Sequence, residues 1–236
     1  GFNYARNGVD AGGAWETMAA DFNPRAGFLP DRDYHSMYFY LDKTRRYKSG
    51  PVSQFYTNVY AENYVHTGGG FYHNDVNFYA NANLRNGLFM DMLIDRPNFE
   101  GSADQAFTMN MAYPANNPYN SISVSKTIAN YGGVNFNSTG VGLQYRPLRR
   151  LQASLSTQFV DFGGPATQVI GSLRFDKGKY ESFGLRLVRQ DSDLNWTLSY
   201  RMSGKRGNEY FLVLGDPNAR TFQRQIILKV VAPIEI

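Results

Sequence analysis

The chain has no cysteine, little histidine or tryptophan, and no long hydrophobic run. Its 236 residues include no Cys, 3 His and 2 Trp, so disulfides and thiolate chemistry are excluded. No stretch approaches the roughly 20 apolar residues that a transmembrane helix needs, and the mean hydropathy is −0.44. These features exclude a helical membrane protein. They do not exclude a membrane β-barrel, because the signal of each barrel strand is weak.

Charge is also modest and does not point to a charged partner. The chain has 24 Lys and Arg against 20 Asp and Glu, a net charge of +4. No basic tract or nucleic-acid motif is present, so nucleic acid is not an expected partner. The sequence begins at Gly1 without a methionine or the basic and apolar regions of a signal peptide. We interpret this start as a processed export signal or as one piece of a longer protein.

Aromatic residues and alternating segments are what the chain has in abundance. It contains 17 Tyr and 17 Phe, which favour strands and also gather at membrane interfaces. In residues 151–159, apolar Leu151, Ala153, Leu155 and Phe159 alternate with polar Gln152, Ser154, Ser156 and Gln158. A strand with this pattern has one apolar and one polar face. Its length is what a tilted strand needs to cross a bilayer, about 9–11 residues.

Similar segments, separated by turn residues, fill the chain from Tyr34 onward. The predicted strands are residues 34–47, 52–65, 71–83, 88–94, 105–113, 121–129, 134–145, 149–161, 166–175, 180–189, 194–203, 209–214 and 221–231. About twelve strands is the preferred number, because bacterial barrels normally have an even count and residues 88–94 and 209–214 are the weakest segments. Residues 95–104 are predicted to be a polar loop.

Residues 1–33 differ, since glycine and proline interrupt them without a sustained period. We interpret them as a periplasmic or plug-like connecting segment with a short helix near residues 15–20. The predicted domains are therefore this segment and a barrel over residues 34–236.

The apolar faces are expected to point outward to lipid. A barrel of about twelve strands is too wide for side chains to fill its interior. The opposite face carries small uncharged residues such as Ser172, Asn195 and Thr197, which suit a wet lumen. Aromatics near strand ends would form the interfacial girdle, namely Tyr145, Phe159, Phe162, Phe175, Tyr180, Tyr200, Tyr210 and Phe222. The rival architecture is a soluble β-sandwich, which predicts the same alternation.

One segment resembles a known family. Asp21, Phe22, Asn23, Pro24, Gly27, Phe28 and Leu29 match a motif that leads into the first strand of the C-terminal portion of the uncharacterised domain-of-unknown-function 5916 family. That portion is taken to be an outer-membrane barrel that usually follows a domain similar to carbohydrate-binding module family 9. The latter domain is absent here, so its sugar binding is not carried over. The C-terminus, residues 231–236, also lacks the final aromatic residue of many barrels, which favours a processed or partner-assisted barrel.

The sequence offers little catalytic chemistry. His66 and His73 flank the glycines of residues 68–70, and no further ligand is identifiable, so we interpret both as exposed loop residues rather than a metal site. The glycines lack the Lys-Ser/Thr of a phosphate loop, and no Gly-x-Ser-x-Gly motif occurs. Neither an enzyme nor a cofactor is predicted.

Four cations share the polar face of the last strands. Alternation places Arg174, Arg186, Arg201 and Lys229 there, where they would line the lumen and favour an anionic solute. The alternative is that they neutralise carboxylates such as Asp75. We therefore predict a barrel of the bacterial outer membrane with a structural, anchoring or transport-related role. Its expected partners are lipid, a companion subunit or missing N-terminal domain, and an anionic or saccharide solute. An envelope-associated hydrolase or a soluble carbohydrate-binding β-domain is the alternative.

Overall fold

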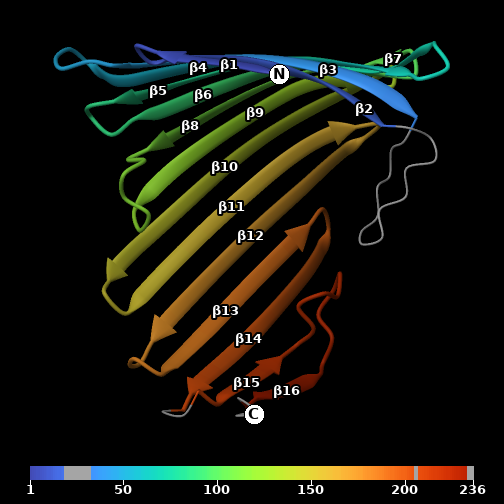
Figure 1. Ribbon diagram of the computed structural model, residues 1–236. Coiled ribbons are helices and arrows are strands. Elements are labelled where there is room, and N and C mark those ends of the chain that lie inside the picture. The colour runs from blue at the N-terminus through green and yellow to red at the C-terminus, as the bar shows by residue number, and fades with distance from the viewer. Residues whose placement is uncertain (19–32, 205–206, 233–236) are drawn as a thin grey trace. The chain divides into compact units, whose positions relative to one another are not determined.

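The protein is a β-sheet protein throughout the part that the structure describes. This computed structural model covers residues 1–18, 33–204 and 207–232 and contains a single antiparallel, up-and-down sheet of 16 strands (Figure 1). The strands are β1 (Phe2–Arg6), β2 (Val9–Met18), β3 (Tyr34–Arg46), β4 (Val52–His66), β5 (Phe71–Leu84), β6 (Phe89–Phe99), β7 (Ser102–Ala103), β8 (Gln105–Tyr113), β9 (Ser121–Tyr131), β10 (Val134–Leu148), β11 (Leu151–Phe162), β12 (Pro165–Asp176), β13 (Glu181–Gln190), β14 (Asp193–Ser203), β15 (Glu209–Leu214) and β16 (Ile226–Val231). Over these ranges no helix is long and apolar enough to cross a membrane.

Consecutive strands are neighbours in the sheet, apart from the short β7, which pairs only with β6. Within the described residues β1 is bonded to β2 alone and β16 to β15 alone, so the sheet has two ends and is not closed. The expected number of about twelve strands is wrong. The rival β-sandwich is also not observed, because the described strands belong to one sheet.

The chain forms two compact units. Unit 1 comprises Gly1–Met111 and Lys126–Asn137, and unit 2 comprises Ala112–Ser125 and Ser138–Ile236. Each of the thirteen strand segments predicted above overlaps an observed strand. Two boundaries differ by several residues: β6 continues to Phe99, and with β7 it occupies most of the expected loop 95–104, whereas the last strand begins only at Ile226 instead of residue 221.

The N-terminal segment differs most from expectation. Phe2–Arg6 and Val9–Met18 are strands of the sheet, and the helix expected near residues 15–20 is wrong for residues 15–18. Asn7 and Gly8 join the two strands with positive φ angles of 54° and 75°, as a tight hairpin requires. The matched family motif from Asp21 to Leu29 lies outside the described residues.

Candidate functional site

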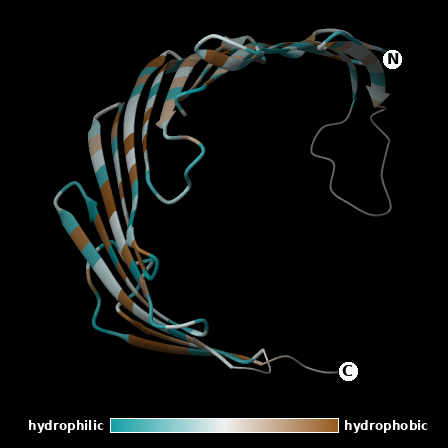
Figure 2. Ribbon diagram, turned by 90° about the vertical axis from the view of Figure 1, so that its left-hand side faces the viewer, coloured by the Kyte–Doolittle hydropathy of each residue, from teal (hydrophilic) through white to brown (hydrophobic). Residues whose placement is uncertain are grey.

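The strand register of unit 2 separates two chemically different faces. Directly paired residues point to the same side of an antiparallel sheet. The row Leu155, Gly171, Leu187 and Trp196 runs across β11–β14. In β12–β14 the exposed large hydrophobic side chains all belong to the face of this row, namely Leu173, Phe175, Phe183, Leu187, Leu194 and Leu198. We call this side the apolar face of unit 2 and the opposite side its polar face. Figure 2 shows the resulting alternation along the strands.

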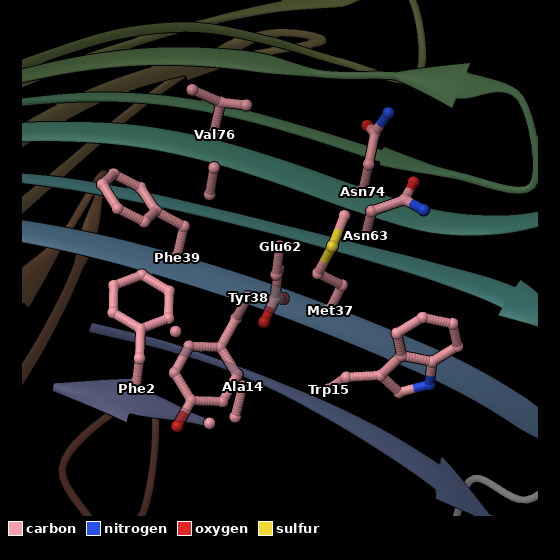
Figure 3. Close-up of a pocket in the computed structure, with 13 residues that line it drawn as sticks. Phe2, Ala14, Trp15, Met37, Tyr38, Phe39, Glu62, Asn63, Asn74 and Val76 are labelled. Atoms are coloured by element: carbon pink, nitrogen blue, oxygen red, sulfur yellow. The ribbon is translucent and has the colours of Figure 1, made fainter.

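Unit 1 has the same two-sided construction. In β1–β5 the exposed large hydrophobics lie on one side of the sheet, the apolar face of unit 1: Phe2, Tyr4, Trp15, Met37, Phe39, Leu41, Phe55, Phe71 and Val76. An open apolar hollow of about 720 Å³ lies between these side chains, where Gly13 and Ala61 are too small to fill the surface. Figure 3 shows Phe2, Trp15, Met37, Phe39 and Val76 around it.

Over the ranges that the structure describes, neither unit has a hydrophobic core. Among the described residues, only Ala80 and Ala129 are buried hydrophobics, whereas Trp15 is 70% exposed and Ile226 is 73% exposed. Burial of apolar surface is the main stabilising contribution in proteins that fold in water. The exposed apolar faces of this sheet do not gain this stabilisation, because their side chains are not buried against other parts of the described chain.

The polar face of unit 1 carries tyrosines bonded to carboxylates. The Tyr56 hydroxyl donates to Asp42 Oδ1 at 2.8 Å, and Asn58 Nδ2 donates to the same oxygen at 2.6 Å. Tyr60 and Tyr64 donate to Glu62 Oε2 at 2.6 and 3.4 Å. Phenol and amide groups therefore hydrogen-bond the carboxylates of these strands.

Ring contacts join the same tyrosines across strands. Tyr34 packs edge-on against Tyr64 with centroids 5.1 Å apart, and Tyr38 stacks on Tyr60 at 6.3 Å. Aromatic pairs of this kind each contribute about 0.5–1.5 kcal/mol. The sequence reasoning missed this network, although the alternation that found the basic residues of β12–β16 also places Tyr56, Tyr60 and Tyr64 on one face.

His73 is hydrogen-bonded to Glu62, the carboxylate to which Tyr60 and Tyr64 donate. His73 Nε2 lies 3.1 Å from Glu62 Oε1, and the side chain is 22% exposed. His73 belongs to β5, so its interpretation as an exposed loop residue is wrong. His66, at the end of β4, contacts the ring of Tyr72 with centroids 4.9 Å apart. Within the described ranges, no three His, Asp or Glu side chains form a group that could hold a metal ion.

The polar face of unit 2 carries the four predicted cations. Arg174 is paired with Gly184, Arg186 with Ser172 and Thr197, Arg201 with Ser182 and Phe211, and Lys229 with Phe211. The register thus places all four on the same side of the sheet. Their exposure to a lumen stays a prediction.

Two of these cations are neutralised locally. Arg174 Nε lies 2.9 Å from Asp176 Oδ1, and Arg201 is paired with Glu209. Both carboxylates come from the same or the adjacent strand. The turn before β13 holds a further pair, in which a hydrogen bond from Lys177 Nζ to Glu181 raises the pKa of Lys177.

The predicted polar residues of β11 lie on the same face as the cations. Gln152 is paired with Arg174, and Ser156 with Ile170. The hydroxyls of Ser154 and Ser172 are 2.5 Å apart, and Gln158 Nε2 donates to Ser138 Oγ at 3.4 Å. Hydrogen bonds between strands therefore satisfy part of this face.

The aromatics predicted to form a girdle occupy several environments. Phe159, Phe175 and Tyr200 lie on the apolar face of unit 2, and Tyr145 is an exposed residue of β10. Tyr180 and Phe222 are in connections between strands rather than in strands. The Phe222 ring stacks on Trp196 with centroids 4.2 Å apart.

Comparison of the chain with family models, curated proteins and solved structures finds no match. The resemblance at Asp21–Leu29 therefore stays a prediction. The function is inferred from the chemistry of the two faces of the sheet.

Proposed function

We propose that the protein spans the outer membrane of a bacterium with its strands, the apolar faces against lipid and the polar faces toward water. The observation that carries this proposal is the exposure of large apolar side chains on one face of β1–β5 and on one face of β12–β14, without a hydrophobic core among the described residues. Contiguous exposed apolar surface of this kind is uncommon on monomeric soluble proteins and marks protein or membrane interaction surfaces. Lipid acyl chains would cover it.

Strand lengths support this proposal. Strands β2–β6 and β8–β14 contain 9 to 15 residues each. A tilted strand needs about 9–11 residues to cross the hydrocarbon layer. Strands that only had to form a soluble sheet are usually shorter, about 5–6 residues.

The positions of charges on the apolar faces also support it. Charged residues on these faces lie within three residues of the first or last residue of a strand: Arg6, Lys43, Arg45, Arg96, Asp161, Glu181 and Arg189. A charge near the bilayer midplane costs several kcal/mol, and the cost falls toward the interface. Lys126, in the middle of β9, is the exception: by alternation it shares a side with the exposed Val124 and Ile128, and its ammonium group donates to Asn137.

The role of this membrane-spanning sheet is structural, anchoring or transport-related, as part of a larger protein or assembly. Edge strands β1 and β16 are exposed along their whole length and keep one side unpaired within the described residues. Free edges of this kind pair readily with another strand. A companion segment or subunit would cover them.

Tryptophan fluorescence tests the orientation. Trp15 and Trp196 both lie on apolar faces. In vesicles that contain brominated lipids, we expect the fluorescence of both tryptophans to be quenched. The variant Trp15→Phe reports Trp196 alone, and the variant Trp196→Phe reports Trp15 alone. The matched control is Ser156→Trp in a chain without the native tryptophans, because Ser156 lies on the polar face. The control should respond to a water-soluble quencher instead. A protein that stays monomeric in plain buffer, or equal lipid quenching at all three positions, would contradict the proposal.

A further inference from the structure

The polar face of unit 2 contains a hollow surrounded by arginines. It has a volume of about 310 Å³, and its polar lining consists of Arg174, Arg186, Arg201, Ser172, Ser182, Thr197 and Ser199. We propose that this hollow binds a phosphate or sulfate group of a solute. The inference rests on the proposed function, because the group must reach the polar face from water.

Gly184 creates the space for such a ligand. In the register it lies between Arg174 of β12 and Ser199 of β14, so one position in this row has no side chain. A Cβ atom at Gly184 would lie 2.5 Å from Ser199 Oγ. A side chain here would therefore displace Ser199 and fill the hollow.

Positive charge exceeds negative charge around the hollow. Arg174 and Arg201 have Asp176 and Glu209 as partners, and a guanidinium with one carboxylate partner keeps further N–H donors free. Arg186 has no carboxylate or hydrogen-bond partner among the described residues, and its neighbours across the strands are the hydroxyl side chains Ser172 and Thr197. An anion would supply the missing counter-charge.

The geometry favours a tetrahedral oxyanion. Arg174 and Arg186 are diagonal neighbours on adjacent strands, within reach of one another for long side chains. Arg201 approaches from β14, where its guanidinium lies 5.5 Å from the centroid of the Phe211 ring. Cations from three adjacent strands can donate to different oxygens of one phosphate or sulfate. Guanidinium groups bind these oxyanions through paired N–H donors.

Calorimetry on the full chain in detergent micelles tests the proposal, with inorganic pyrophosphate and sulfate as probes at low ionic strength. We expect saturable binding that Arg186→Gln weakens about tenfold or more, because a charge-assisted hydrogen bond is lost. Arg186→Lys keeps the charge and should retain part of the affinity. The matched control is Arg189→Gln, since Arg189 lies on the same strand but on the apolar face. Its affinity should equal that of the unchanged protein.

Each outcome decides between the two proposals. Equal binding by the Arg186→Gln variant, or no binding by the unchanged protein, would overturn the anion site. If the tryptophans are quenched by brominated lipid while no anion binds, the membrane proposal stands and the anion site fails. If an anion binds while lipid does not quench the tryptophans, the anion site stands and the membrane proposal fails.

Discussion

An arginine placed on the apolar face should destabilise the protein strongly, whereas an arginine at the next position of the same strand, on the polar face, should not. Leu155 lies in the central part of β11 on the apolar face, next to Gly171 and exposed to 46%. An arginine facing lipid near the midplane costs about 2–4 kcal/mol, a change of roughly 30-fold to several hundred-fold in the folding equilibrium. On a surface that faces water, the same change is usually within about 0.5 kcal/mol.

The experiment compares Leu155→Arg with Ser156→Arg, its neighbour on the polar face. Both chains are refolded into vesicles and unfolded with guanidinium, and Trp196 fluorescence reports the transition. We expect Leu155→Arg to lose about 2–4 kcal/mol of unfolding free energy and Ser156→Arg to lose about 0.5 kcal/mol or less. Equal losses in the two variants would refute the assignment of the apolar face to lipid.

Two further substitutions test the sheet itself. Gly13→Ala should lower the unfolding free energy by about 1–3 kcal/mol, because its Cβ would lie 2.8 Å from the Tyr38 carbonyl oxygen. The control is Gly171→Ala, which should be close to neutral because the nearest atom to its Cβ is 4.0 Å away. Equal midpoints of denaturation for the two variants would contradict this expectation. Glu62→Ala should cost about 1.5–3 kcal/mol, because Tyr60, Tyr64 and His73 lose their carboxylate partner. Glu16→Ala, an exposed residue of β2, is the control and should leave the unfolding free energy almost unchanged.

The alternation of apolar and polar residues was sufficient to locate most strands. Most predicted segments end at residues that break a strand, such as Asn86 and Gly87, where Gly87 has a φ of 92°. The same alternation placed Arg174, Arg186 and Arg201 on one side, as the register shows. Periodicity is local, so it needs no knowledge of the partner strand.

The N-terminal hairpin was missed because its glycines resemble a turn. Gly12 and Gly13 lie inside β2, where the Tyr40 ring and the Tyr38 carbonyl approach them so closely that a Cβ would clash. Glycine in a strand interior often marks such a close approach. The Asn7-Gly8 pair was the signal that would have identified the hairpin. The ion pair between Arg201 and Glu209 depends on contacts between strands that periodicity does not specify.

The two edges of the sheet, which have no further partner strand in the described part of the chain, limit which strands could extend it. All strands except β7 follow one another and alternate in direction, so β1 and β16 run in the same direction. Joining these edges directly would require a parallel pair, which differs from the antiparallel ladders in the rest of the sheet. One strand inserted between them, or any odd number, would allow antiparallel pairing on both sides. We therefore expect the complementing segment or subunit to contribute an odd number of strands.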